Sequence, residues 1–178
     1  MQLSPTPLEG AWVVHMDRHE DPRGFFGRTY CEREFAAHGL CTQWVQSNVS
    51  FNHQRGTLRG MHYQIEPHGE EKLVHCTAGA IVDVIVDVRP ESPTYRQYFA
   101  IELSHDNRDQ LYIPRGMAHG FLTLADDTKV AYQMGNFYHP ESARGFRYDD
   151  PAIGIPWPEP VTVISDRDRD LPTFENHL

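Results

Sequence analysis

Between residues 57 and 134 the chain is a succession of short apolar runs separated by turn-forming residues, and this pattern constrains its fold more than any other feature. Each run has the length and residue content of a β-strand, with glycine, proline, asparagine or aspartate before the next. Strands at such intervals predict a β-sandwich or barrel. The expected strands are Thr57 to Gln64, Lys72 to Cys76, Ala80 to Val88, Tyr98 to Leu103, Gln110 to Ile113, Gly120 to Leu124 and Val130 to Met134.

One segment, residues 32–38 ("EREFAAH"), has the pattern of a helix, and Gly39 follows it where a helix commonly stops. The length of 178 residues is that of one domain. We therefore predict a single all-β domain over residues 1–178 with few short helices. Its core barrel is expected at about residues 45–150, with N-terminal strands and a tail from Pro151 wrapping around it.

The composition excludes several classes of protein. The net charge of −9 and the lack of a basic stripe argue against nucleic-acid binding. The most apolar stretch, "AIVDVIVDV", contains two aspartates and is too short to cross a membrane. The first ten residues lack the basic start and apolar run of a signal peptide. Three cysteines without a C-x-x-C motif predict reduced thiols in a cytoplasmic protein: Cys31, Cys41 and Cys76.

Alternation along the strands assigns side chains to faces. In "IVDVIVDVR" the valines share one face, whereas Asp83, Ile85 and Asp87 share the other. The two acids either point into a polar cavity or face water, and the pattern does not decide between these alternatives. Other groups that share a face are His62 with Gln64, Lys72 with Val74 and Cys76, and Val130 with Tyr132 and Met134.

The stretch "RGTLRGMHYQ" carries Arg59 and His62, which strict alternation places on opposite faces of the strand. Gly60 lies between them, and a glycine inside a strand often marks a β-bulge. A bulge at Gly60 would bring both side chains to the same side of the sheet.

The segment "PRGMAHGF" (114–121) has the P-x-G-x-x-H form of the second motif of a cupin. The first motif of a metal-binding cupin needs H-x-H followed by glutamate, but this chain has "HYQ" there, beginning at His62. His62 and His119 alone are a poor ligand set, because a catalytic metal usually has three protein ligands. His119 is then a packed, inert histidine, unless a metal-dependent cupin enzyme draws a carboxylate from Glu66, Glu70 or Glu71.

Acid–base chemistry without a metal gives the same histidine another role. A histidine is suited to act as a general base near neutral pH, and Lys72 beside His62 would stabilise an oxyanion. Tyr132 is a weak acid on another strand, and Asp168, in "SDRDRD", would orient an imidazole. Each residue also has an ordinary reading, as a solvated lysine, a half-buried strand tyrosine or a charged surface loop, and spacing alone does not decide.

Eight segments together resemble one family, the dTDP-4-dehydrorhamnose 3,5-epimerases and related sugar-nucleotide epimerases. They occur in the family's order over about Asp21 to Pro172: "DPRGFFGRTY", "WVQSNVSFN", "GTLRGMHYQ", "EKLVHCTAGAIVDVIVDVRPESPTY", "LYIPRGMAHGFLTL", "VAYQMGNFYHP", "DDPAIGIPWP" and "SDRDRDLP". The resemblance implies a cupin-like jelly-roll β-barrel that uses no metal and is usually a homodimer.

The resemblance also implies a catalytic set. His62 matches the base that takes a proton from carbon 3, carbon 5 or both of a nucleotide-linked 4-keto-6-deoxyhexose. Asp168 matches the partner acid of this histidine, Lys72 the lysine near the enolate oxygen, and Tyr132 the tyrosine that returns a proton from the opposite face. No cofactor is implied, because only protons move. A catalytically silent sugar-nucleotide binding protein is the remaining alternative, and it has no need of a base and an opposing acid.

Further positions match contacts to a nucleotide-diphosphate sugar. Arg59 and His119 match residues that touch the substrate, and the others belong to the diphosphate and the base: Arg23, Phe26, Gln46, Asn48, Tyr138 and Arg167. Arginine suits phosphate because its planar fork binds two oxygens at once. Part of this set comes from the neighbouring subunit in the family, so the resemblance implies a homodimer.

The chain departs from the family at the nucleotide end. Thymidine users commonly have glutamate where this chain has Arg28 and Ala143, although Glu141 is close by. We therefore expect epimerisation and leave dTDP, CDP and GDP open as the nucleotide.

Overall fold

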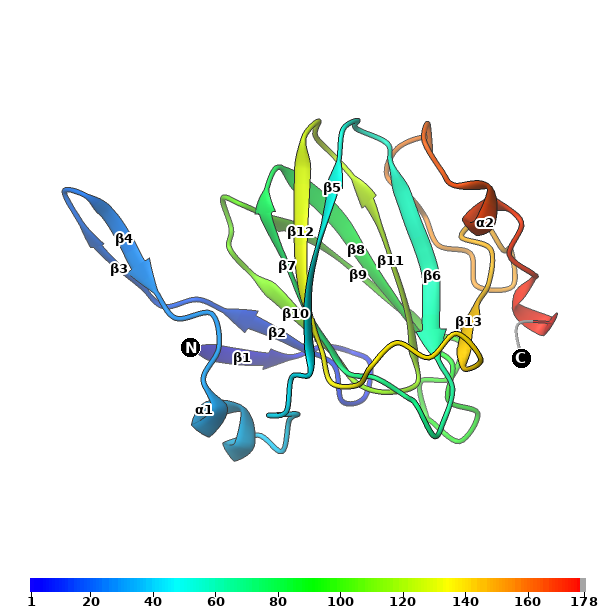
Figure 1. The fold of residues 1–178 in the computed structure, drawn as a ribbon, viewed down its shortest axis with the longest axis horizontal. Helices are drawn as coiled ribbons and strands as arrows, with labels where there is room; N and C mark the ends of the chain where they lie inside the picture. The colour runs from blue at the N-terminus through cyan, green and yellow to red at the C-terminus, as the bar shows by residue number, and fades with distance from the viewer. Residues whose placement is uncertain (177–178) are drawn as a thin grey trace.

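The computed structural model describes residues 1–176, which form two antiparallel β-sheets, a projecting hairpin and a few helical turns (Figure 1). The first sheet contains β1 (Gln2–Pro5), β2 (Trp12–His15), β5 (Gln46–Asn52), β7 (Lys72–Ala78), β10 (Gln110–Ile113) and β12 (Thr128–Met134). The second contains β6 (Leu58–Gln64), β8 (Ala80–Asp87), β9 (Tyr98–Ser104), β11 (Met117–Thr123) and β13 (Ala143–Gly145). The predicted domain of residues 1–178 includes residues 177 and 178, which lie outside the described residues.

The strand order of each sheet is that of a folded-over barrel. The first sheet runs β1-β2-β10-β7-β12-β5 and the second runs β13-β6-β11-β8-β9, so neighbours in space are seldom neighbours in sequence. This arrangement confirms the predicted all-β, cupin-like jelly roll with few short helices.

Apolar side chains from both sheets fill part of the space between them. Val74, Leu111 and Val130 project from the first sheet, and Ile85 and Phe121 project from the second. All five are buried. Removing this much apolar surface from water is the main driving force that holds the two sheets together.

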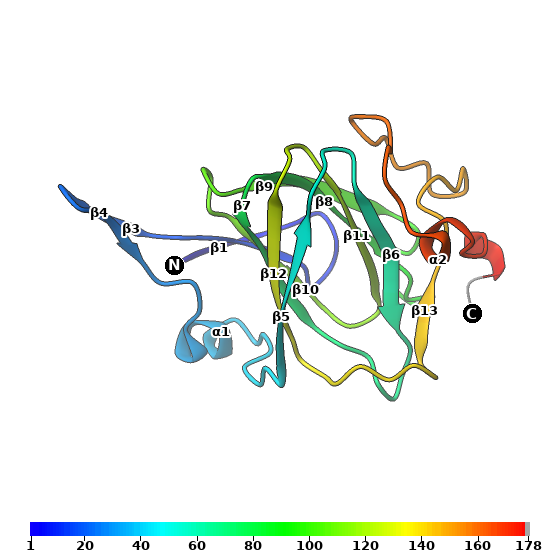
Figure 2. The ribbon, with the colours of Figure 1, turned by 45° about the horizontal axis from the view of Figure 1, so that its top comes forward.

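A second core lies on the outer face of the second sheet. The predicted valine face of β8 contributes Val84 and Val86, which pack against Phe146, Ile153 and Phe174 of the C-terminal segment. Figure 2 shows this segment, orange to red, running alongside β6 and β13. It therefore covers the sheet that carries His62.

β6 is irregular at the position where the sequence suggested a bulge. His119 of β11 pairs with His62, and Phe121 pairs with Arg59, so two steps along β11 correspond to three along β6. Gly60 has a φ of +133°, and a Cβ there would lie 2.5 Å from a backbone atom of β11. Glycine is therefore required, and the extra residue turns Arg59 and His62 toward the same cavity.

A hairpin of β3 (Arg18–Asp21) and β4 (Gly24–Gly27) extends away from the sheets (Figure 1). The guanidinium of Arg108 lies 4.6 Å from the centre of the Phe25 ring and braces the hairpin against the body. Phe26 is 72% exposed. The hairpin thus presents apolar and charged side chains to the space beyond this chain.

The helical elements are short. α1 (Glu32–Ala37) ends one residue before the predicted helix does. α2 (Asp166–Arg169) and the 3-10 turn η1 (Phe174–Asn176) were not predicted, because a four-residue turn leaves no helical periodicity to recognise. No helix within residues 1–176 is long and apolar enough to cross a membrane.

The seven predicted strands are all present, with shifted ends. β11 begins at Met117 instead of Gly120, and β8 ends one residue before Val88. β5 lies outside the predicted strands, and its residues are largely polar. β5 is an edge strand, and its outward Val49 and Phe51 are exposed, so the usual contrast between buried apolar and exposed polar positions is missing.

Candidate active site

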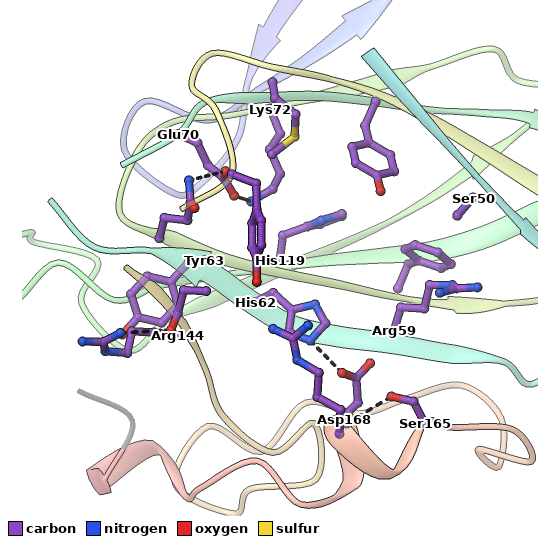
Figure 3. A pocket seen from close by; sticks show the side chains of 17 residues that line it. Ser50, Arg59, His62, Tyr63, Glu70, Lys72, His119, Arg144, Ser165 and Asp168 are labelled. Atoms are coloured by element: carbon purple, nitrogen blue, oxygen red, sulfur yellow. Dashed lines mark hydrogen bonds and ion pairs between the residues drawn. The ribbon is translucent and has the colours of Figure 1, made fainter. Parts of the chain in front are cut away.

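A cavity of about 370 Å³ opens between the sheets (Figure 3). β5, β7 and β12 line it from the first sheet, β6, β11 and β13 from the second, and α2 from the C-terminal segment. A concave site with a few converging charged groups is typical of small-molecule binding. The charged or ionisable side chains in its lining are Arg59, His62, Tyr63, Glu70, Lys72, His119, Tyr132, Tyr138, Arg144, Arg167 and Asp168.

His62 and Asp168 form a hydrogen-bonded pair at the cavity wall (Figure 3). Nε2 of His62 lies 2.8 Å from Oδ1 of Asp168, and Oδ2 of the same carboxylate accepts a hydrogen bond from the N–H of Gly60 at 3.2 Å. The side chain of His62 is 40% exposed, but that of Asp168 is only 7% exposed. A buried carboxylate in this position fixes the ring and stabilises its protonated form, which leaves Nδ1 for proton transfer.

α2 holds Asp168 in place. Ser165 caps the helix, and its Oγ accepts a hydrogen bond from the backbone N–H of Asp168 at 3.1 Å. The preceding segment is tied to β6, because the N–H of Leu58 donates to the carbonyl of Val163 at 2.8 Å. Burial raises the pKa of Asp168, but the hydrogen bond and charge of His62 and a backbone N–H of β6 together bring that pKa below its usual range. Asp168 is therefore a carboxylate at neutral pH.

Lys72 enters the cavity from the start of β7. Its Nζ lies 2.6 Å from Oε1 of Glu70, and the side chains of Lys72 and Glu70 are 8% and 7% exposed. Gln64 donates a hydrogen bond from Nε2 to the other oxygen of Glu70 at 2.8 Å. A buried charge needs such a partner, because desolvation without compensation is strongly unfavourable. The alternative of a solvated surface lysine is therefore wrong.

Tyr132 lines the cavity from β12, in the sheet opposite His62. Burial raises its pKa, and nearby Arg59 lowers it by less, so the phenol keeps its proton at neutral pH. Nε of Arg59 donates to Oδ1 of Asn52 at 2.8 Å. This bond holds the guanidinium at the cavity edge.

His119 also has a buried aspartate as its partner. Its Nε2 lies 2.7 Å from Oδ1 of Asp83, whose side chain is fully buried. Asp87 is buried too, so the water-facing alternative is wrong for both acids of β8. The carboxylate of Asp87 accepts hydrogen bonds from the side chains of a neighbouring turn, namely Arg89, Ser92 and Thr94. Asp83 thus serves the cavity by holding His119, whereas Asp87 stabilises a turn.

The donor groups of the cavity fit a metal ion poorly. Nε2 of His62 and Nε2 of His119 each contact an aspartate. The ammonium of Lys72 is fixed in the same cavity, where it would repel a cation. It also forms an ion pair with the carboxylate of Glu70, one of the glutamates considered as a metal ligand. The other two glutamates considered as ligands do not line the cavity, namely Glu66 and Glu71. The residues present therefore favour chemistry by side chains over chemistry by a bound metal.

The remaining predicted contact residues divide into two groups. Tyr138 and Arg167 line the cavity. Gln46 lies beside Tyr138, because its Oε1 accepts a hydrogen bond from the N–H of Tyr138 at 3.0 Å. Asn48 shares a face of β5 with Gln46 and with the cavity residue Ser50, so these side chains extend one wall of the cavity.

The other group lies away from the cavity of this chain. Arg23 is 90% exposed on the projecting hairpin, where it pairs with Asp21, and Phe26 is on the same hairpin. Arg28 is 3.6 Å from Glu34, in a shallow surface hollow. Within one chain, therefore, these three predicted substrate contacts do not line the cavity.

Sequence reasoning missed several residues of the cavity. The sequence puts Gln64 on the face of His62 without indicating a role, and it suggests Glu70 only as a metal ligand. Ser165 had a recognisable signal, because a serine three residues before an acid is typical of a helix N-cap. The sequence does not indicate that Arg144 is a cavity residue, because β13, the strand that carries it, is only three residues long and shows no clear alternation.

Comparisons with known proteins agree on one family. A sequence model described as dTDP-4-dehydrorhamnose 3,5-epimerase matches residues 5–176. The dTDP-4-dehydrorhamnose 3,5-epimerase of Sinorhizobium fredii is 46% identical over 163 residues, which are 91% of this chain and 84% of that protein. The crystal structure of the enzyme of this name from Elizabethkingia anophelis has a TM-score of 0.95 at 37% identity, covering 98% of this chain and 97% of that chain.

A third relative was solved with a ligand. The dTDP-6-deoxy-D-glucose-3,5-epimerase from Legionella pneumophila, in complex with dTDP-4-keto-L-rhamnose, has a TM-score of 0.92 at 34% identity. The match covers 98% of this chain and 93% of that chain. Sequence and structure agree over nearly the whole length, and the chain belongs to the dTDP-4-dehydrorhamnose 3,5-epimerase family of isomerases.

Proposed function

We propose that this protein is a cofactor-independent epimerase that inverts carbon 3, carbon 5 or both in a nucleotide-linked 4-keto-6-deoxyhexose. The observation that carries the proposal is the hydrogen-bonded pair of His62 and Asp168, which faces a protonated Tyr132 from the opposite sheet across one cavity. Inversion requires a base and an acid on opposite faces of the sugar ring, and the position of His62 and Tyr132 on different sheets around one cavity supports these roles.

The reaction needs only proton transfer. A ketone at carbon 4 acidifies the neighbouring C–H bonds, and His62 removes one of these protons while the electron pair moves to the carbonyl oxygen. Lys72 stabilises the enolate, and a single well-placed donor of this kind contributes about 3 kcal/mol. The electron pair then returns to the same carbon, which Tyr132 protonates from the other face, and the ketone is restored. Solvent takes the proton from His62 and returns one to Tyr132. General acid–base groups typically accelerate such steps by about 10²–10⁴-fold each.

The two histidines differ in exposure, although each is held through Nε2 by a buried aspartate. The side chain of His62 is 40% exposed, so it suits exchange of protons with substrate and solvent, whereas that of His119 is only 11% exposed. We assign His119 and Arg59 to binding of the sugar and its 4-keto oxygen. Arg167 and Tyr138 lie at the cavity wall, where they suit the diphosphate and the nucleotide.

We propose that a homodimer completes the site. The hairpin of β3 and β4 carries Arg23 and Phe26 away from this chain's own cavity, and both side chains are strongly exposed. A partner's hairpin reaching this cavity would add a cation for the diphosphate and a ring for the base.

Mixing two inactive variants tests this arrangement. His62→Ala lacks the base, and Arg23→Ala lacks the hairpin cation, so each homodimer should turn over poorly. If the hairpin serves the partner, mixed dimers regain one intact site, and about a quarter of the original sites recover after random exchange. Absence of any recovery in verified mixed dimers would contradict a shared site.

Solvent exchange tests the chemistry. The protein is incubated with dTDP-4-keto-6-deoxyglucose in deuterium oxide, and carbons 3 and 5 are followed by NMR. Deuterium at both carbons with inverted configuration indicates a double epimerase, and label at one carbon indicates a single-centre enzyme. The same experiment with the CDP and GDP sugars tests whether Arg28 and Ala143 have changed the nucleotide. No exchange with any of the three, despite measurable binding, would contradict an epimerase.

A further inference from the structure

Gln64, the last residue of β6, is a buried polar side chain to which the proposed reaction assigns no task. It lines the cavity and is 3% exposed. A buried amide has to satisfy both a donor end and an acceptor end, because an unpaired polar group away from water is costly. The partners of Gln64 therefore indicate what its side chain holds in place.

The hydrogen bonds of this amide allow one orientation. Its oxygen, Oε1, accepts a hydrogen bond from the backbone N–H of His139 at 2.6 Å. Its nitrogen, Nε2, shares two hydrogens among three acceptors, namely the carbonyls of His68 and Phe137, each at 3.0 Å, and Oε2 of Glu70 at 2.8 Å. Exchanging the two ends would place an oxygen against three acceptors. The donor end of the amide is thus directed at the carboxylate of Glu70.

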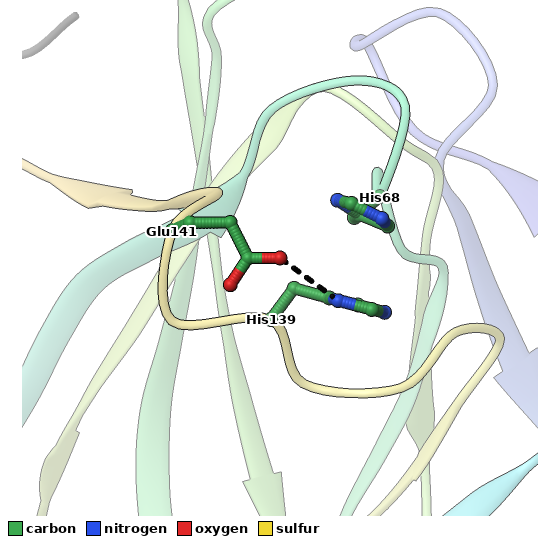
Figure 4. A group of neighbouring side chains, drawn as sticks. All are labelled: His68, His139 and Glu141. Carbon is green, nitrogen blue, oxygen red and sulfur yellow. Dashed lines mark hydrogen bonds and ion pairs between the residues drawn. The ribbon is translucent and has the colours of Figure 1, made fainter.

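Two loops anchor the amide, and they are also tied to each other (Figure 4). His68 belongs to the loop between β6 and β7, and His139 belongs to the loop between β12 and β13. Their rings stack, with centres 3.6 Å apart and planes that differ by 14°. A second link joins Nδ1 of His68 to Oγ of Ser142 at 2.8 Å. Gln64 is therefore held by a packed junction of two loops.

Glu70 is held at both of its carboxylate oxygens. Oε2 accepts the hydrogen bond from Gln64, and Oε1 lies 2.6 Å from Nζ of Lys72 (Figure 3). The side chains of Glu70 and Lys72 are 7% and 8% exposed, so little water competes for either group. A carboxylate that is fixed at one oxygen by an oriented donor restrains whatever is bound to the other oxygen. The position of the Lys72 ammonium thus depends on Gln64 as well as on Glu70.

We infer that Gln64 is a positioning residue, which orients Glu70 and thereby places the ammonium of Lys72 for the reaction. The inference rests on the proposed function, in which Lys72 stabilises the enolate. Such stabilisation depends on a donor that is already in place where the negative charge develops. A displacement of about 1 Å in a group of this kind can lower the rate by about 10²-fold.

Gln64→Met removes the donor and keeps a side chain of similar length. We expect kcat to fall by about 10–100-fold, with a much smaller change in KM, because the lost restraint matters mainly in the transition state. Ser142→Ala is the matched control, since it removes a link between the same two loops without touching Glu70, and its kcat should be nearly unchanged. Equal losses in both variants, or a Gln64→Met effect confined to KM, would overturn the inference.

A double-variant cycle tests whether Gln64 acts through Glu70. Glu70→Ala leaves no carboxylate to orient, so the addition of Gln64→Met should lower kcat no further. Two independent effects would instead multiply in the double variant, and that result would overturn the inference.

NMR of the lysine ammonium groups gives a readout that needs neither turnover nor a variant. The sequence contains two lysines, Lys72 and the exposed Lys129. The ammonium of Lys72 should exchange its hydrogens with water at least about tenfold more slowly than that of Lys129, because it is ion-paired and shielded. Gln64→Met should bring the two rates closer together.

Equal exchange rates in the unaltered protein, or a Lys72 rate that Gln64→Met leaves unchanged, would overturn the restraint on Lys72. Slow exchange in a protein that epimerises no keto sugar would instead refute the proposed reaction and leave the restraint standing. The failure of one is therefore distinguishable from the failure of the other.

Discussion

The imidazole of His62 and the carboxylate of Asp168 meet at 2.8 Å although 106 positions separate the two residues in the chain. β6 supplies the base and the C-terminal segment supplies its partner. The same carboxylate also accepts the N–H of Gly60, at the bulge that turns His62 toward the cavity. The orientation of the base therefore depends on both segments at once.

Replacing Asp168 by asparagine should preserve the shape of the pair but remove its charge. We expect kcat to fall by about 10²–10⁴-fold, because the imidazolium formed during proton abstraction loses its partner. Steady-state kinetics with the keto sugar measure this. Asp166→Asn is the control, since Asp166 lies on the same helix turn with a side chain that is 88% exposed. Equal losses in both variants would point to damage of α2 instead.

Asp168 should also contribute a pH-dependent part of the stability. Its pKa is lower in the folded protein than in an unfolded chain, so its contribution is complete above the unfolded pKa of about 3.9 and disappears as the pH falls through the folded pKa. The difference in unfolding free energy between the unaltered protein and Asp168→Asn should therefore shrink from neutral pH toward acid. Urea unfolding at a series of pH values measures it. A difference that is constant over the acid range would refute the linkage.

Tyr132→Phe should separate proton removal from inversion. The base remains, so a proton at carbon 3 or carbon 5 still exchanges with deuterium oxide, but reprotonation from the opposite face fails. We expect exchange with retained configuration and loss of the inverted product, both visible by NMR of the sugar. Loss of exchange together with inversion would mean that Tyr132 is needed before the enolate forms.

Glu70→Gln should destabilise the fold by about 3–5 kcal/mol, because it leaves Lys72 as a buried charge without its partner. Equilibrium urea unfolding measures the loss. The double variant Glu70→Gln with Lys72→Met removes the stranded charge as well, so it should recover a large part of the stability. A single variant within about 0.5 kcal/mol of the unaltered protein would show that the pair is not desolvated.

Gly60→Ala should destabilise the protein by at least about 1 kcal/mol more than Gly24→Ala. Both glycines have a strongly positive φ, +133° and +125°, so both substitutions strain the backbone similarly. Only at Gly60 does a Cβ meet the facing strand, because nothing lies within 4 Å of a Cβ at Gly24. Thermal and urea unfolding of the pair isolate the contact between β6 and β11. Equal effects would contradict the close approach of these strands.

The strands of the barrel were predictable because their residues alternate or are uniformly apolar between turns. β5 was not, since an exposed edge strand with polar residues lacks that contrast. The bulge in β6 was predictable from Gly60 alone, because few other features explain a glycine at that point of a strand.

The pairing of site residues was harder to predict from spacing. His119 and Asp83 belong to neighbouring strands, yet the pattern left open whether Asp83 faces a cavity or water. Asp168 lies in a run of alternating charges that reads as a solvated loop, yet in the structure it is buried, with its carboxylate against His62 and the backbone of Gly60. Its role came from resemblance to a family, because the physical partner is set by tertiary folding and not by local sequence.

The C-terminal position of Asp168 has a consequence for synthesis of the protein. Once residues 1–150 have left the ribosome, every strand of both sheets has been synthesised. The chain then already contains His62, Lys72 and Tyr132. The acid that steadies His62 arrives only afterwards, when the last segment packs over the second sheet. A chain cut short after its barrel would therefore lack both the acid beside His62 and the wall of the cavity that α2 supplies. Loss of turnover would report the truncation although the strands had all been made.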